Sequence, residues 1–199
     1  MRAALAVALA LTVLGASACA QSKPDTQTPP PGHSEPAPVS PALAAQLDQA
    51  RAATAKYAVD LAGAQAAGYK IITKMMPGMG YHYLNPDVQG FDITKPAILV
   101  YQRHGDSWEL GALEWVWPET PASPPLEGAT YGSFDAACHF ADGTFVAAAA
   151  EKDCAALTPE TGVAFGFWHP KLVTLHVWLW EHNPAGLYSP TNPLVPREG

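Results

Sequence analysis

The sequence predicts an α+β domain in which one long N-terminal helix packs on a mainly antiparallel sheet. Two observations predict this class. A single helical stripe is followed by short apolar runs separated by Gly, Pro, Asn and Asp, and these runs lack the regular alternation with helices that is typical of parallel sheets. The chain is also 48% hydrophobic, which excludes a disordered protein. Its net charge of -7 argues against a nucleic-acid partner, because such a partner needs a basic face.

Residues 1–18 have the pattern of a secretory signal peptide, with a basic residue, an apolar stretch and then small residues. Two interpretations of its end stay open. The small residues directly before Cys19 resemble a bacterial lipobox, which predicts that Cys19 is lipidated and anchors an exported protein to an envelope membrane. An A-x-A cleavage site would instead release a soluble periplasmic or extracellular protein.

Residues 19–41 are predicted to be the lipidated cysteine and a tether. The segment 21–41 combines seven prolines with polar residues, and such a composition cannot bury apolar surface. We therefore expect residues 42–199 to form a single globular domain. This domain is expected to be attached to the membrane only through the lipid anchor.

The predicted helix begins with Ser40 as its N-cap and Pro41 in its first turn. Apolar residues then recur at spacings of three and four from Leu47 to Ala64, and Gly68 is the expected C-cap. Because the stripe is narrow and partly alanine, we expect this helix to lie against a sheet.

The later elements follow from shorter patterns. We predict a strand at 69–73, a hairpin over 97–117 with its turn at 104–107, a short helix within 147–157, and a strand at 172–180. Segment 119–135 is expected to be a loop rich in Pro and Gly, and residues 182–199 are expected to be ordered coil, in which Asn183 caps a turn.

Two cysteines remain once Cys19 is set aside. Cys138 and Cys154 are 16 positions apart, and in an exported protein they most simply form one disulfide. A metal site built from this pair is the alternative.

The strand at 172–180 carries aliphatic residues on one face, which is the expected partner of the helix. The other face places His176 among aromatic residues, which is typical of a pocket wall. The alternative is that His176 is a hydrogen-bonded residue of a second small core. We predict a ligand pocket around His176 and His82, and the residues expected to line it are Tyr81, Tyr83, Asn85, Trp178 and Trp180.

Glu114 lies in a strand that otherwise looks buried, and alternation puts it on one face with Leu110, Ala112 and Val116. A buried carboxylate must be paired, protonated or bound to a metal. On neighbouring strands, His82, Glu114 and His176 would make a set of two histidines and one carboxylate, which suits a divalent ion of Fe, Zn or Mn. Three methionines near His82 make copper the alternative metal.

Several familiar catalytic motifs are missing from the sequence. It has no G-x-S-x-G, P-loop, H-E-x-x-H or C-x-x-C pattern, so a serine or cysteine nucleophile has no support.

Two longer motifs carry a resemblance. Residues 78–86 read G-M-G-x-H-Y-x-N-P, and residues 175–186 read L-H-V-W-x-W-x-x-N-P-x-G. With these motifs the chain resembles, over about residues 50–195, a family of uncharacterised exported bacterial proteins. The resemblance implies an exported single domain and implies no activity. We therefore expect an envelope lipoprotein that binds a small ligand or a metal ion; a metal-dependent enzyme and a structural domain with core histidines are the alternatives.

Overall fold

The computed structural model describes residues 39–159 and 161–196, so the predicted signal peptide, Cys19 and nearly all of the tether lie outside the described residues. In the described part, no helix is both long and apolar enough to cross a membrane. That part is mainly β, with nine strands in two antiparallel sheets and only short helices. The predicted α+β class with one long helix packed on a sheet is therefore wrong.

The predicted helix is broken in two. Helix α1 (Pro41–Thr54) begins as expected, since the Ser40 side chain accepts a hydrogen bond from the backbone N–H of Leu43. It continues into the 3₁₀ turn η1 (Ala55–Tyr57) and stops. Asp60 then caps a second helix, α2 (Leu61–Ala66), by accepting from the backbone N–H of Gly63. Aspartate favours such a cap over a helix interior because its side chain competes for backbone hydrogen bonds.

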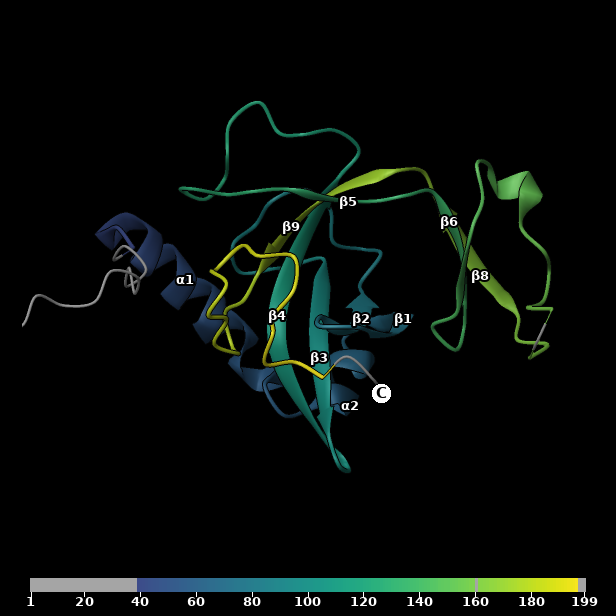
Figure 1. The fold of residues 1–199 in the computed structure, drawn as a ribbon, viewed down its shortest axis with the longest axis horizontal. Coiled ribbons are helices and arrows are strands. Elements are labelled where there is room, and N and C mark those ends of the chain that lie inside the picture. Colours follow the sequence, from purple (N-terminus) through teal and green to yellow (C-terminus); the bar gives the residue numbers. More distant parts are fainter. Residues whose placement is uncertain (1–38, 160, 197–199) are drawn as a thin grey trace, which may run out of the picture. The chain divides into compact units, whose positions relative to one another are not determined.

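The larger sheet has six strands in the order β1-β2-β3-β4-β9-β5, all paired antiparallel. Figure 1 shows β3 and β4 side by side at its centre. The strands are β1 (Lys70–Met76), β2 (Gly80–Leu84), β3 (Ile98–His104), β4 (Ser107–Trp117), β9 (Leu172–Val177) and β5 (Gly132–Phe134). The hairpin predicted over 97–117 is confirmed as β3 and β4.

A bulge in this hairpin changes which side chains share a face. Val100 pairs with Ala112 but Tyr101 pairs with Leu110, so Gly111 is the extra residue in β4. Leu110 consequently packs in the core with Leu113, whereas Ala112 lies on the opposite face. The prediction that Leu110 shares the face of Glu114 is therefore wrong, because simple alternation fails across a bulge.

The two faces of the six-stranded sheet are buried differently. One face packs against Leu43 and Ala50 of α1 and contains the largest buried side chains, including Trp115, Tyr101 and Leu99. Leu175 and Val177 of β9 lie on it, as the aliphatic face of the predicted strand requires. The other face carries a smaller apolar cluster, which consists of Ile72, Ala97, Ile98, Val100, Ala112, Trp178 and Val195.

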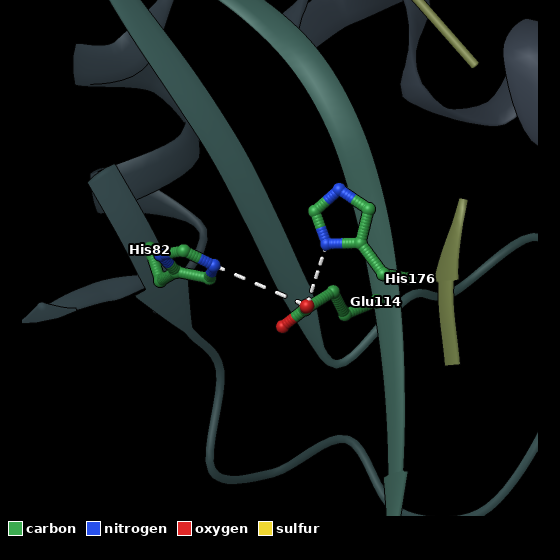
Figure 2. A group of neighbouring side chains, drawn as sticks. All are labelled: His82, Glu114 and His176. Atoms are coloured by element: carbon green, nitrogen blue, oxygen red, sulfur yellow. Dashed lines mark hydrogen bonds and ion pairs between the residues drawn. The ribbon is translucent and has the colours of Figure 1, made fainter. Parts of the chain in front are cut away.

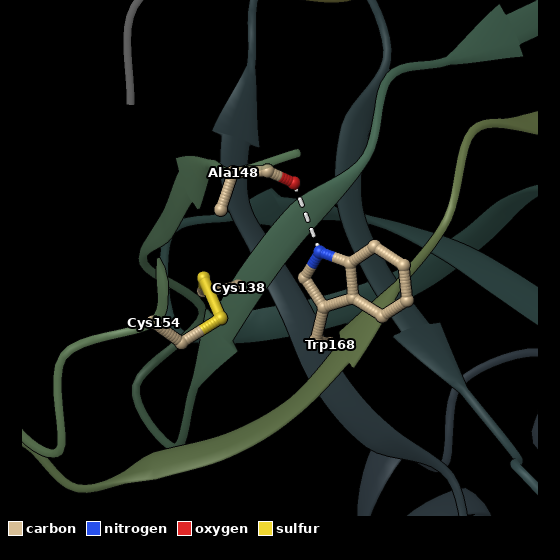
Figure 3. The surroundings of a disulfide bond; sticks show 4 residues. All are labelled: Cys138, Ala148, Cys154 and Trp168. Carbon is tan, nitrogen blue, oxygen red and sulfur yellow. Dashed lines mark hydrogen bonds between the residues drawn. A yellow bond between two sulfur atoms is a disulfide. The ribbon is translucent and has the colours of Figure 1, made fainter. Parts of the chain in front are cut away.

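The second sheet has three strands in the order β7-β6-β8, namely β7 (Phe145–Ala147), β6 (Ala137–Phe140) and β8 (Phe165–His169). Cys138 of β6 is joined to Cys154 in a disulfide, which confirms the predicted pair and excludes a metal site built from the two thiols. Figure 3 shows Trp168 close to this bond, with its indole N–H donating to the carbonyl oxygen of Ala148. The helix predicted within 147–157 is wrong, since only the 3₁₀ turn η2 (Glu151–Asp153) forms there.

The chain beyond β9 has no helix or strand among the described residues 178–196, which confirms the coil predicted from residue 182 onward. Asn183 caps a turn by accepting from the backbone N–H of Ala185. The bulge at Gly111 holds the start of this segment, because the Gly111 carbonyl accepts from the backbone N–H groups of Trp180 and Glu181. The strand therefore ends at Val177, three residues earlier than predicted.

Candidate metal centre

Pairing of the strands β2, β3, β4 and β9 brings His82, Glu114 and His176 together on the face of the sheet opposite α1. Glu114 of β4 lies directly opposite His176 of β9. His82 of β2 lies opposite Val100 of β3, and Val100 lies opposite Ala112, two residues before Glu114. Because residues two apart on a strand point to the same face, the Glu114 side chain can reach both histidines.

The geometry of the three side chains is close and convergent. Glu114 Oε1 is 2.7 Å from His176 Nδ1 and 3.9 Å from His82 Nε2, and Figure 2 shows the carboxylate between the two rings. All three residues are buried, with exposed fractions of 4%, 4% and 5% for His82, Glu114 and His176. One ligand atom from each residue lies within 4.8 Å of the other two.

Thr73 fixes the orientation of the His82 ring. Its hydroxyl oxygen is 2.8 Å from His82 Nδ1 and also accepts from the His82 backbone N–H at 3.2 Å. With Nδ1 held by an oxygen, Nε2 is the nitrogen that faces Glu114. This is the usual arrangement of a metal-ligating histidine, whose second ring nitrogen is hydrogen-bonded to an oxygen.

The electrostatics keep the groups in the protonation states that a metal requires. Burial lowers the pKa of His82 below its ordinary value, and this outweighs the opposite effect of the Glu114 charge. Burial alone would raise the pKa of Glu114, but its pKa is lowered overall, and the hydrogen bond from His176 is among the causes. A neutral imidazole and an anionic carboxylate at neutral pH are both competent ligands.

The spacing of the donor atoms fits one divalent ion after a small closure. Nitrogen and oxygen ligands lie about 2.1 Å from Zn²⁺, so two ligands of one ion are at most about 4.2 Å apart. The widest separation here, 4.8 Å, must therefore close by at least about 0.6 Å, and by about 1.4 Å for a tetrahedral ion, whose ligands lie about 3.4 Å apart. A bound ion would also displace the hydrogen between His176 Nδ1 and Glu114 Oε1. Two imidazoles and one carboxylate are a donor set that suits Zn, Fe or Mn.

A cavity of about 310 Å³ adjoins the three side chains, and all three of them line it. Its walls come from elements that are distant in sequence: Met76 and Met79 beside the β1–β2 turn, Tyr131 and Phe134 at β5, and Tyr188 in the C-terminal coil. Polar side chains also line it, among them those of Thr73, Thr130, Ser133 and Thr174. A concave, mostly apolar cavity with a few convergent polar groups is typical of a small-molecule site.

The residues predicted to form the pocket lie elsewhere, which corrects that prediction. Tyr83 is buried in the core on the α1 face, and Tyr81 packs edge-on against Trp108. Asn85 donates to the carbonyl oxygen of Ala67.

The two predicted tryptophans are also outside this cavity. Trp178 packs on the His176 ring, with centroids 4.7 Å apart, and donates to the Ser189 carbonyl oxygen. Trp180 donates to Thr54 Oγ1 of α1. Period-two alternation could not place Trp180, because the strand has already ended at Val177.

Sequence reasoning missed the true cavity walls. Tyr131, Phe134 and Tyr188 come from segments rich in Pro and Gly that were predicted only as loop or coil. The large aromatic residues inside these segments could have indicated a binding site, because a fully solvated loop would not bury them.

The other buried histidines take no part in this group. His139 and His169 stack on each other in the second sheet with centroids 4.9 Å apart. Their Nδ1 atoms bond to the carbonyl oxygens of Ile72 and Pro170. Burial lowers the pKa of His139 to about 4, so this ring is neutral in neutral solution.

Comparison of the chain with protein-family models, with curated proteins and with solved structures finds no match.

Proposed function

We propose that this protein binds one divalent metal ion through His82, Glu114 and His176 and presents it to a small molecule in the adjoining cavity. The observation that carries the proposal is the convergence of three buried ligand atoms within 4.8 Å at the wall of that cavity. A purely structural core has no need of a carboxylate between two histidines, because burying an ionised group is costly.

The cellular setting is part of the same proposal. We infer an exported protein of the bacterial envelope that is anchored through a lipid on Cys19. The Cys138–Cys154 disulfide supports an oxidising compartment. Replacement of Cys19 by serine should release the protein from the membrane fraction, and unchanged membrane association would contradict the anchor.

Metal binding is tested on protein stripped with a chelator and titrated with Zn²⁺, Mn²⁺ and Fe²⁺. We expect one ion per chain and a loss of at least tenfold in affinity for His82→Ala and His176→Ala. Glu114→Gln keeps the shape of the side chain and removes its charge, so it should also weaken binding. His104→Ala is the matched control, because His104 is exposed at the end of β3.

Two results would overturn the proposal. Wild-type protein that takes up no ion would leave the three side chains as a hydrogen-bonded core. Equal affinities of the wild type, His82→Ala and His176→Ala would place any bound metal elsewhere.

A metal-dependent enzyme is the second candidate function. Three protein ligands leave a tetrahedral ion with one open position, as in catalytic zinc sites, and the cavity lies beside the ligands. Hydrolysis of small ester substrates that depends on added metal and is abolished by Glu114→Gln would support it. Activity that survives chelation would contradict it.

A further inference from the structure

We propose that the cavity holds a small uncharged molecule with one hydroxyl or carbonyl group and an apolar tail, and that the tail enters a second cavity behind the first. This inference rests on the proposed function for the location of the site, but binding of the molecule itself requires no metal.

The charge of the cavity selects against ionised ligands. Among the residues that the structure describes, its lining contains neither lysine nor arginine, and Glu114 is its one acidic residue. In metal-free protein, a carboxylate ligand would meet the Glu114 charge with no compensating lysine or arginine from these residues. An ammonium group would instead compete with the metal for Glu114. An uncharged head group avoids both conflicts.

Two buried polar atoms that lack partners favour a head group able to form hydrogen bonds. Tyr131 and His176 both line the cavity, and neither the Tyr131 hydroxyl nor His176 Nε2 has a hydrogen-bond partner in the described part of the protein. Buried polar groups are normally paired, so each unpaired one calls for a ligand or a water. Both atoms have almost no accessible surface, so a ligand hydroxyl can accept from Tyr131 or donate to His176 Nε2 only after a small shift of these side chains.

The second cavity provides space for an apolar tail. It measures about 60 Å³, and its walls include Val116, Leu84, Phe167 and Leu172. Its lining shares four residues with that of the main cavity, so the two adjoin; these are Ile72, Ile98, Phe134 and Thr174.

The two volumes set the length of the molecule. A non-hydrogen atom of water size occupies about 30 Å³, so the main cavity accepts roughly ten such atoms and the rear cavity roughly two more. Linear alcohols of about eight to eleven carbons match this combined size.

The experiment measures binding of 1-hexanol, 1-octanol and 1-decanol to the full mature protein by calorimetry in the presence of a chelator. Each buried methylene should tighten binding by about fourfold until the cavities are full. Hexanoate and octanoate should bind at least tenfold more weakly than the alcohols of equal length. Absence of binding by every alcohol would overturn the proposal, as would carboxylates or hexylamine that bind more tightly than hexanol.

Val116 tests the rear cavity because it lines that cavity and not the main one. Val116→Phe should fill the rear space and shorten the longest tightly bound alcohol by about two carbons. Val116→Ala should lengthen it, and this variant keeps the test decisive if the larger side chain impairs folding. An unchanged length preference in a folded variant would overturn the placement of the tail.

The design separates this inference from the proposed function. Alcohol binding in a protein that takes up no metal would retain the inference and overturn the metal site. Metal binding without alcohol binding would do the reverse.

Discussion

Replacing Thr73 by valine tests whether Thr73 orients His82 for the proposed metal ion. Valine keeps the shape of the side chain but replaces the hydroxyl that lies 2.8 Å from His82 Nδ1. Metal binding through Nε2 requires the ring proton on Nδ1, where the Thr73 oxygen can accept it. Loss of such a partner typically weakens metal binding 10- to 100-fold, which corresponds to about 1.4 to 2.7 kcal/mol.

The same substitution also affects stability, and the two effects must be measured separately. Thr73 is fully buried, and its hydroxyl makes two contacts with His82. At about 0.5 to 1.5 kcal/mol for each hydrogen bond, the metal-free variant should lose about 1 to 3 kcal/mol in its free energy of unfolding. Urea denaturation in a chelator gives this loss, and competition with a chromophoric chelator gives the metal affinity of the folded protein.

Two further variants make the prediction refutable. Thr73→Ser retains the hydroxyl and should bind metal within about threefold of the wild type, well inside the loss expected for valine. Thr174→Val removes a hydroxyl that lines the same cavity without contacting His82, so its affinity should also be near that of the wild type. Wild-type affinity in Thr73→Val, or equal losses in the serine and valine variants, would refute the orienting role.

Three further predictions concern the fold. Replacing both Cys138 and Cys154 by alanine should lower the free energy of unfolding by about 3 kcal/mol in urea denaturation, because the bond closes a 16-residue loop; a loss below about 1 kcal/mol would contradict this loop-entropy argument. Gly80→Ala should lower the free energy of unfolding by more than about 2 kcal/mol, since Gly80 has φ +120° and an added Cβ would approach the Tyr101 carbonyl oxygen to 2.4 Å. Gly90→Ala should lower it by about 1 kcal/mol, because Gly90 has φ +69° but lies in open space. Equal losses in the two variants would contradict the steric reason. Hydrogen bonds from Lys74 and Thr144 lower the pKa of Asp142 from 3.8 to about 2, so the stability it contributes is present above about pH 4 and is lost as the pH falls toward 2; the difference in melting temperature between the wild type and Asp142→Asn should shrink over that range, and a difference that stays constant would refute it.

The elements that could be predicted are those whose signals are local. The hairpin of β3 and β4 follows from two apolar runs around a turn, and the start of α1 follows from Ser40 and Pro41. The fold class could not be predicted in the same way. The apolar stripe runs on past the break at Asp60, and the short strands of the second sheet pair only with one another.

The residues of the candidate site could likewise be predicted only where their sequence signal is local. His82, Glu114 and His176 were recognisable because each is an ionisable residue with an apolar or aromatic residue on either side of it, and this property is visible in a single segment. The cavity walls at Tyr131 and Tyr188 were not, because loops without periodicity bring them there. The bulge at Gly111 could not be predicted from the sequence either, although it determines on which face of the sheet Leu110 lies.

The distribution of the three ligands over β2, β4 and β9 has a kinetic consequence. Glu114 and His176 are 62 residues apart in sequence, so no local segment can hold the ion before β9 has joined the sheet. A bound ion would therefore act as a reversible cross-link between distant strands and stabilise only the fully assembled protein. Detachment of β9 from β4 would release it. The exchange rate of the metal would then report how often β9 separates from β4.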